Sequence, residues 1–356
     1  MKRDDLHFTF KTVDGYSKPF VAVISEREAG KSTAAWCDKA WKAYKNGKST
    51  IVIRRLINDI TDVYINDIGE VINKFAIKPI KLIFKKGSIK DGVVDVYTSD
   101  EPDRLFFRVI ALSNPMSRIK SLIVRNLKYI IFDEFICNTK LGEKYLNNEA
   151  FKFKELFNTF QRENPDLTCY FLGNPYSVYT PYFEWWGVDY AKLKPGAIVK
   201  GDVWVIQCYQ ILPELKELIL KRNPLYKFDD AYKNYAFGGI AINDANLRIR
   251  SKQPESYYLS SVFHIDNDLI GVYRSNSEHA WEEGNVFWVG KVRLEDLSAN
   301  RYIQCFDLND LDDRHIMYTK DLTIKYQTLK LCIGTRYVEY QDIGVAYKMY
   351  AVYQKL

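Results

Sequence analysis

The chain has 356 residues and a mass of 41.7 kDa, with 47% hydrophobic and 27% charged residues. This is the composition of a globular protein long enough for two domains, and it excludes a chain that is mainly disordered. The net charge of +6 favours polyanionic partners mildly, far below the charge of a histone-like protein.

Cysteine spacing and hydropathy further limit the class of protein and the compartment that we expect. The six cysteines are scattered, with no CxxC pair, so neither a disulfide framework nor a zinc ribbon is predicted. No run approaches the roughly 18 apolar residues needed to span a bilayer, and the start lacks the apolar core of a signal peptide. We expect a soluble intracellular protein without a membrane partner.

In chain order, the first half alternates between strand and helix patterns. Residues 19–24 are β-branched and aromatic, as in a buried strand, and residues 31–44 have helical spacing that stops at Asn46 and Gly47. Residues 49–53 complete a βαβ unit. Further along, the sequence predicts a hairpin at 80–98, strands at 129–132 and 168–172, and a helix at 149–162.

The pattern changes after residue 203. A strand at 203–208 and an amphipathic helix at 213–221 precede a stretch broken by NP, GG and QP pairs. From residue 257 onwards the pattern is rich in strands, with candidates at 260–266, 269–274 and 285–289. We therefore predict an α/β domain with a central, mostly parallel sheet at 1–208, a linker or helical lid at 209–255, and a smaller α+β domain at 256–356.

The segment 25–33 (SEREAGKST) carries the first chemical motif. A P-loop has the pattern GxxxxGK[ST] between a strand and a helix, where loop amides and the helix N-terminus hold phosphates and the hydroxyl ligates Mg²⁺. Gly30, Lys31 and Ser32 match it, whereas Ser25 replaces the first glycine. The tripeptide alone is a weak signal, so the prediction depends on its place between strand and helix.

The second motif is the strand at 129–132, which ends in Asp133 and Glu134. In P-loop NTPases an aspartate in this place holds Mg²⁺, and a glutamate directly after it activates water as general base. Taken alone, the pair could be a solvated acidic turn. Together, in this order, the two motifs predict a site for ATP and Mg²⁺.

ATP hydrolysis coupled to mechanical work usually requires an arginine finger, often from a neighbouring subunit. Spacing cannot choose among the six candidates, because surface arginines are common. They are Arg27, Arg54, Arg55, Arg118, Arg125 and Arg162.

These motifs, in this order, resemble the DNA-encapsidation ATPases of the phi-twenty-nine-like small tailed bacteriophages, relatives of the large terminases. The resemblance runs from the first strand to about Trp186. It is carried by Arg27 inside the P-loop, IVIRR at 51–55, Lys120 with Ser121, IFDEF at 131–135, NTFQR at 158–162, GNPYSV at 173–178 and PYF at 181–183.

The resemblance implies a P-loop NTPase domain of the ASCE type and a C-terminal domain like a degenerate RNase H-like nuclease. It implies a homo-oligomeric, pentameric ring that drives double-stranded DNA through the portal, or connector, into a preformed capsid. A packaging RNA is a further implied partner. The implied location is the host cytoplasm and, transiently, the portal vertex, but not the mature virion.

It also implies roles by position. Lys31, Ser32 and Thr33 would bind phosphate and Mg²⁺ together with the rest of the loop, which is Arg27, Glu28, Ala29 and Gly30. Asp133 would hold the metal and Glu134 would be the base. Arg162 matches the trans-acting finger, Lys120 a basic residue that assists it, and Asn174 a γ-phosphate sensor or coupling element. No role is carried over to the pair Arg54 and Arg55.

The loop departs from the family at Ser25 and Glu28, which stand where the pattern has glycines. The carboxylates of Glu26 and Glu28 would repel a triphosphate if they faced it. We therefore expect them to point outward or to pair with Arg27.

Other assignments remain open. Basic residues at 85–86, 118–120 and 140–144 are candidates for DNA contact, or merely solvated charges, and the aromatic stretch 176–186 is interpreted as packing. A terminase-type protein with an active two-metal nuclease is the alternative function, and a P-loop relic without activity is a third. The carboxylates that could form a nuclease site are Asp266, Asp268, Asp307, Asp310, Asp312 and Asp313.

Overall fold

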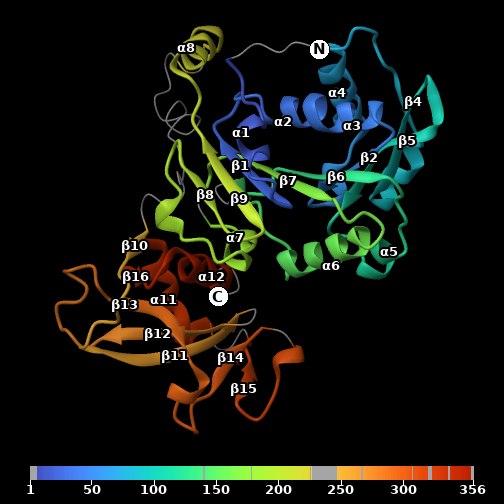
Figure 1. The fold of residues 1–356 in the computed structure, drawn as a ribbon. Helices are drawn as coiled ribbons and strands as arrows, with labels where there is room; N and C mark the ends of the chain where they lie inside the picture. The colour runs from blue at the N-terminus through green and yellow to red at the C-terminus, as the bar shows by residue number, and fades with distance from the viewer. Residues whose placement is uncertain are drawn as a thin grey trace. The chain divides into compact units, whose positions relative to one another are not determined.

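The computed structural model describes residues 6–138, 141–177, 179–224, 226, 247–265, 268–306, 308–319, 323–335 and 337–353 (Figure 1). The chain forms two compact units, residues 1–243 and 244–356. The first unit extends beyond residue 208, the predicted end of the α/β domain, because the segment after β9 (Trp204–Tyr209) packs onto that domain. Most of the predicted linker, residues 227–246, lies outside the described residues.

The first unit alternates strands and helices as the sequence predicts. Its elements are α1 (Lys11–Asp14), β1 (Phe20–Ser25), α2 (Lys31–Ala34), η1 (Ala35–Trp41), α3 (Lys42–Lys45), β2 (Ser49–Arg54), η2 (Ile57–Asp59), α4 (Asp62–Asn73), β3 (Leu82–Phe84), η3 (Lys86–Asp91), β4 (Val93–Thr98), β5 (Glu101–Ala111), α5 (Met116–Lys120), β6 (Leu127–Asp133), α6 (Glu149–Gln161), β7 (Thr168–Gly173), α7 (Pro181–Trp185), η5 (Tyr190–Lys192), β8 (Ile198–Lys200), β9 and α8 (Pro213–Arg222).

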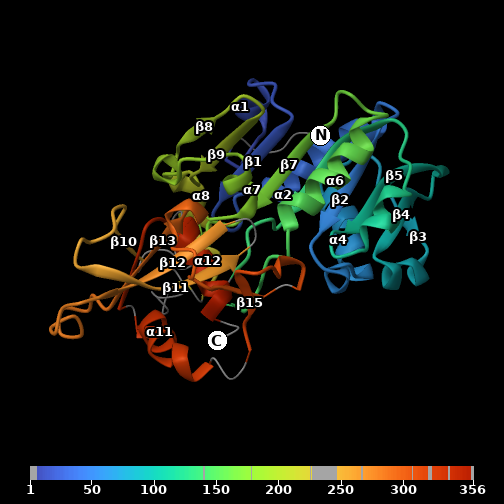
Figure 2. The same ribbon diagram turned by 90° about the horizontal axis from the view of Figure 1, so that it is seen from below.

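These strands form a sheet with the order β3-β4-β5-β2-β6-β7-β1-β9-β8, which Figure 2 shows from β8 and β9 to β4 and β3. The strands from β5 to β9 in this order are parallel, and antiparallel strands flank them at both edges. Helices cover both faces, with α2 and α3 on one and α6 on the other (Figure 1). Because both faces are covered, the central strands are continuous apolar runs, and every residue of β1 is buried.

The predicted helix at 31–44 is one continuous helix, 31–45. Its α2, η1 and α3 segments join through residues with right-handed helical angles, and η1 is a π-helical stretch. It ends before Gly47, whose φ of +73° is the left-handed conformation that glycine adopts without strain. The predictions missed α4 and β5, and the predicted hairpin at 80–98 is β3 and β4, joined by η3.

The second unit has a mixed sheet with its own apolar core. Its elements are β10 (Arg248–Ile249), β11 (Tyr257–Ile265), β12 (Asp268–Ser275), β13 (Phe287–Val292), η6 (Leu294–Asp296), β14 (Ile303–Cys305), η7 (Leu308–Asp310), β15 (His315–Met317), α11 (Thr323–Thr335), β16 (Val338–Tyr340) and α12 (Ile343–Tyr353). The strands β11, β12 and β13 form the predicted antiparallel meander. The apolar sides of α11 and α12 pack on this sheet. Within the described ranges, no helix combines the length and hydropathy required to cross a bilayer.

Candidate nucleotide-binding site

The loop between β1 and α2, where the sequence predicts a P-loop, makes a tight turn at Gly30. Gly30, the residue before the helix, has a φ of +86°, and a Cβ at this position would lie 3.1 Å from the Cβ of His7. Both the left-handed backbone and the close approach of His7 therefore favour glycine here. The backbone amide of Phe8 donates to the carbonyl of Ala29 at 2.9 Å, so the segment before β1 supports the loop from one side.

Lys31 begins the helix and its ammonium group points back along the loop. Its Nζ donates to the Ser25 carbonyl at 3.2 Å and to Asn174 Oδ1, just after β7, at 2.7 Å. The side chain is 8% exposed, and burial lowers its pKa to about 8, although Asp133 opposes this shift. A phosphate would replace these neutral oxygens with charged ones, so the lysine is held where it can bind an anion.

The carboxylate predicted to hold metal lies beside the hydroxyl predicted to do so. β6 lies two strands from β1 in the sheet, and Asp133 ends it. Ser32 Oγ donates to Asp133 Oδ1 at 3.3 Å. Burial raises the pKa of Asp133, while Arg54 favours its ionised form. The structure therefore brings together Lys31, Ser32 and Asp133 at the carboxyl ends of parallel strands, where open α/β sheets bind ligands.

Glu134 adopts a backbone conformation that is rare for a non-glycine residue, with a φ of +60°. Its side chain is 59% exposed and accepts a hydrogen bond from Arg54 Nη2 at 2.8 Å. Arg54 also lies 3.9 Å from Asp133 and over the ring of Tyr64. Such left-handed residues cost about 1–3 kcal/mol and are concentrated at functional sites, so the backbone of Glu134 is that of a candidate functional residue.

Arg55, one of the six candidates for the arginine finger, instead anchors the backbone behind this glutamate. Its guanidinium donates to the carbonyls of Glu134 at 3.1 Å and Phe135 at 2.7 Å. It also pairs with Glu149 through two hydrogen bonds of 2.9 and 3.1 Å, and Tyr182 donates to Glu149 at 3.0 Å. The signal in the sequence was the arginine pair at the end of a buried strand, a costly place for charge unless it is paired.

Arg27 and Asn174 meet at Tyr176. Arg27 Nη2 and Asn174 Nδ2 both donate to the Tyr176 hydroxyl, at 2.8 and 3.2 Å. The loop is thus connected to the segment after β7 twice, here and through Lys31. Tyr176 and most of the aromatic stretch 176–186 are buried, which confirms that this stretch serves packing.

The two acidic residues of the loop contact the segment after β9. Glu26 Oε2 accepts from the backbone amide of Ile211 at 3.2 Å, and burial raises the pKa of Glu26. Glu28, with a φ of +63°, forms an ion pair with Arg222 at the end of α8. Both carboxylates therefore have partners on residues 211–222, whereas we expected them from the sequence to point outward or to pair with Arg27.

Arg162 and Lys120 are not part of this cluster. Arg162 is exposed and follows the last residue of α6, while Glu149 at the first residue of α6 is the one that reaches Arg55. The 13 residues of α6 span about 20 Å, so Arg162 lies far from Glu134 of its own chain. Lys120 pairs with Glu155 on α6. The structure therefore brings neither Arg162 nor Lys120 to the loop.

Two of the carboxylates considered for a nuclease site, Asp268 and Asp312, accept hydrogen bonds from lysine or histidine side chains. Asp268 pairs with Lys291 at 2.8 Å and with the buried Lys348, so ammonium groups occupy the place a cation would need. Asp312 accepts from His315 at 2.7 Å. Asp266 and Asp307 lie outside the described residues, and within the described ranges no group of three His, Cys, Asp or Glu could hold a metal. The nuclease-like character of this unit stays a prediction.

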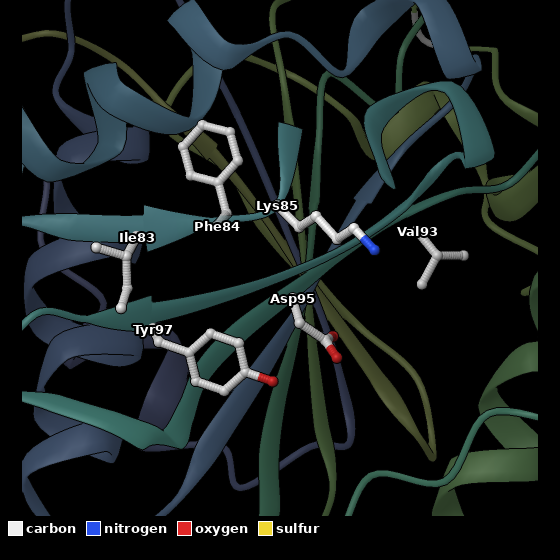
Figure 3. Close-up of a pocket in the computed structure, with 6 residues that line it drawn as sticks. All are labelled: Ile83, Phe84, Lys85, Val93, Asp95 and Tyr97. Carbon is white, nitrogen blue, oxygen red and sulfur yellow. The ribbon is translucent and has the colours of Figure 1, made fainter. Parts of the chain in front are cut away.

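A hollow of about 550 Å³ lies on β3 and β4, at the edge of the sheet away from the loop. Figure 3 shows its six lining residues, Ile83, Phe84, Lys85, Val93, Asp95 and Tyr97. Asp95 is paired with Arg108.

The basic residues considered for DNA contact are partly paired. Arg118 and Lys120 pair with Asp91 and Glu155, and Lys140 lies outside the described residues.

A mostly parallel α/β sheet with a tight turn between β1 and the helix that Lys31 begins, and an acidic pair at the end of β6, defines a P-loop NTPase fold. Among solved structures, the chain is similar to the bacteriophage Phi-29 viral genome packaging motor assembly, with a TM-score of 0.66 and 19% identity over 99% of both chains. It is similar to the Phi-28 gp11 DNA packaging motor, with a TM-score of 0.62 and 17% identity, again over 99% of both. The whole chain therefore has the fold of these packaging-motor proteins.

A further similar structure is the N-terminal domain of the DNA packaging ATPase from bacteriophage phi29. It has 26% identity and a TM-score of 0.46, and it covers 59% of this chain and 99% of that one. No protein-family model and no curated protein matches the sequence.

Proposed function

We propose that this protein is an ATP-driven motor that moves double-stranded DNA through a portal into a preformed capsid. The observation that carries the proposal is the contact between Ser32 and Asp133, 3.3 Å apart at the end of β6 and the start of the P-loop helix. The similarity of the whole chain to the packaging-motor fold also supports the proposal. Sequence-independent DNA contact would come from basic side chains, whose affinity for the phosphate backbone falls with salt.

The site fits a magnesium ion, because a hydroxyl and a carboxylate supply adjacent oxygen ligands of the kind that Mg²⁺ prefers. Ser32 and Asp133 would hold it. A bound magnesium ion supplies charge neutralisation on the β- and γ-phosphates. Lys31 would bind the phosphates together with the loop amides, and Asn174, its partner in the structure, would contact the γ-phosphate.

Glu134 would act as the general base. Its exposed carboxylate would leave Arg54 and accept a proton from the attacking water, while Arg55 keeps its backbone in place through the Glu134 and Phe135 carbonyls. Arg162 of a neighbouring subunit, assisted by Lys120, would stabilise the charge that develops on the γ-phosphate. This trans geometry is supported by the length of α6, which keeps Arg162 from its own site. We propose a ring, pentameric as in the resembling family, that acts at the portal vertex in the host cytoplasm and is absent from the mature virion.

The test is ATPase activity of the full chain with and without double-stranded DNA, across ionic strength. We expect DNA to stimulate hydrolysis at low salt and less at high salt. Glu134→Gln should retain ATP binding and lose hydrolysis by about 10²–10⁴-fold, whereas Glu163→Gln, at an exposed position beyond α6, should match the wild type. Unchanged turnover in Glu134→Gln would remove that residue as the base, and a folded protein without DNA-stimulated ATPase would favour the inactive relic.

The finger is tested in mixtures. Arg162→Ala subunits have an intact loop, and Lys31→Ala subunits have an intact Arg162. If Arg162 acts in trans, mixing the two inactive variants restores part of the activity. If no mixture regains activity, the trans assignment is refuted.

A further inference from the structure

Two carboxylates within a phosphate-binding loop require an explanation. Glu26 and Glu28 flank Arg27, and a triphosphate in this loop would meet their negative charges. In the structure both are directed to residues 211–222, the segment that follows β9 and includes α8. Glu26 Oε2 accepts from the Ile211 amide at 3.2 Å, and Glu28 pairs with Arg222, the last residue of α8.

An apolar contact lies beside these polar ones. Ala29 is fully buried in a cluster with Ile211, Leu215 and Ile219. Leu215 and Ile219 are one turn apart on α8 and form its buried side. The loop residues 26, 28 and 29 are therefore all fixed by the same segment, through a hydrogen bond, an ion pair and packing.

Resting on the proposed function that this loop binds a triphosphate, we infer that α8 is a clamp that sets the affinity of the loop for nucleotide. With α8 docked, Arg222 neutralises Glu28 and turns its carboxylate away from the phosphates. With α8 displaced, Glu28 loses Arg222 as its partner and repels the triphosphate. Because coupling between two binding events is reciprocal, a bound triphosphate must in turn stabilise the docked helix.

The test measures the dissociation constant of a fluorescent ATP analogue for the full chain at low salt. Arg222→Ala should weaken binding by about three- to tenfold, since it leaves Glu28 unneutralised near the phosphates. The matched control is Lys221→Ala. This variant removes the same charge one residue earlier, from a side chain that pairs with Glu217 on α8 itself, and should leave the constant within about twofold of wild type.

The double variant Glu28→Ala with Arg222→Ala isolates the pair. It should bind as tightly as the wild type or more tightly, because the repelling carboxylate is gone, and recovered binding shows that loss of Arg222 does not unfold the site. Equal weakening by Arg222→Ala and Lys221→Ala, or no recovery in the double variant, overturns the clamp while the proposed function stands. A wild-type chain that does not bind the analogue overturns both.

Hydrogen exchange provides a second readout. Addition of the ATP analogue should slow exchange of the α8 amides in the wild type and in Lys221→Ala, and do so less in Arg222→Ala. Exchange in α8 that does not respond to the analogue in the wild type refutes the reciprocal stabilisation, and with it the clamp.

Discussion

Removal of the Glu149 carboxylate should destabilise the first unit more than any surface change on the same helix. Glu149 is fully buried and accepts four hydrogen bonds, two from Arg55, one from the Tyr182 hydroxyl at 3.0 Å and one from the Leu146 amide at 2.8 Å. In Glu149→Ala, Arg55 would remain as an almost buried charge without its carboxylate.

The magnitude follows from that unpaired charge. Breaking a buried ion pair by removing one partner costs about 3–5 kcal/mol. For a unit of this size, 1 kcal/mol shifts the midpoint of thermal unfolding by about 2–4 °C, so we expect a decrease of about 6–20 °C. Tyr182→Phe removes a single hydrogen bond and should cost about 1 kcal/mol.

The assay is thermal unfolding of the full chain followed by circular dichroism. The matched control is Glu155→Ala, the same change on the same helix. Glu155 pairs with Lys120, and their side chains are 29% and 52% exposed, respectively. Surface pairs contribute about 0–1 kcal/mol, so this variant should unfold close to the wild type. Equal midpoints for Glu149→Ala and Glu155→Ala would refute the role of the buried pair.

Three further results are expected. Burial lowers the Lys31 pKa to about 8 and phosphate favours the protonated lysine, so nucleotide affinity should be constant below about pH 8 and fall above it. Calorimetry in buffers of different ionisation enthalpy should show proton uptake on binding at pH 8–9, and the absence of uptake would contradict the lowered pKa. Ser32→Ala should raise the Mg²⁺ concentration for half-maximal hydrolysis, and a chelator should abolish hydrolysis in the wild type; an unchanged Mg²⁺ dependence would exclude Ser32 as a ligand. Gly173→Ala would place a methyl group 2.8–2.9 Å from Phe135 and Ile136 and should cost about 1–3 kcal/mol in a urea titration, whereas an unchanged transition midpoint would mean that these side chains repack freely.

The sequence predicted most of the central sheet because buried parallel strands have a strong local pattern. The apolar runs that became β1, β2, β6 and β7 are each bounded by polar or turn residues, so their limits agree within about two residues. β5 was missed, since it begins with the charged stretch Glu101–Arg104 and is apolar only in its second half. α4 was missed for a similar reason, because its buried side consists of isoleucines at helical spacing among polar residues.

The residues of the candidate site likewise form two groups, those that a local sequence pattern predicts and those that it does not. Lys31, Ser32 and Asp133 are each fixed by a strand or helix end, and the order of strands brings these ends together, so a linear motif could predict them. Arg54 and Arg55 contact Glu134 and Glu149 across separations of 79 to 94 positions in the sequence. A single sequence contains no local signal for such a pair. The arginine pair was visible, but its partners were not.

The acidic P-loop shows how such distant partners change the meaning of a motif. Judged from the sequence alone, Glu28 in place of a glycine weakens the prediction of nucleotide binding, because the loop loses flexibility and gains a repelling charge. In the structure its left-handed backbone and its carboxylate are both accommodated, the latter by Arg222, 194 positions away. A glycine in this loop carries no charge, whereas a glutamate requires a cation to neutralise its carboxylate. The loop with glutamate therefore depends on the position of that cation. Under the clamp inferred above, this departure from the motif would make phosphate binding depend on the position of α8.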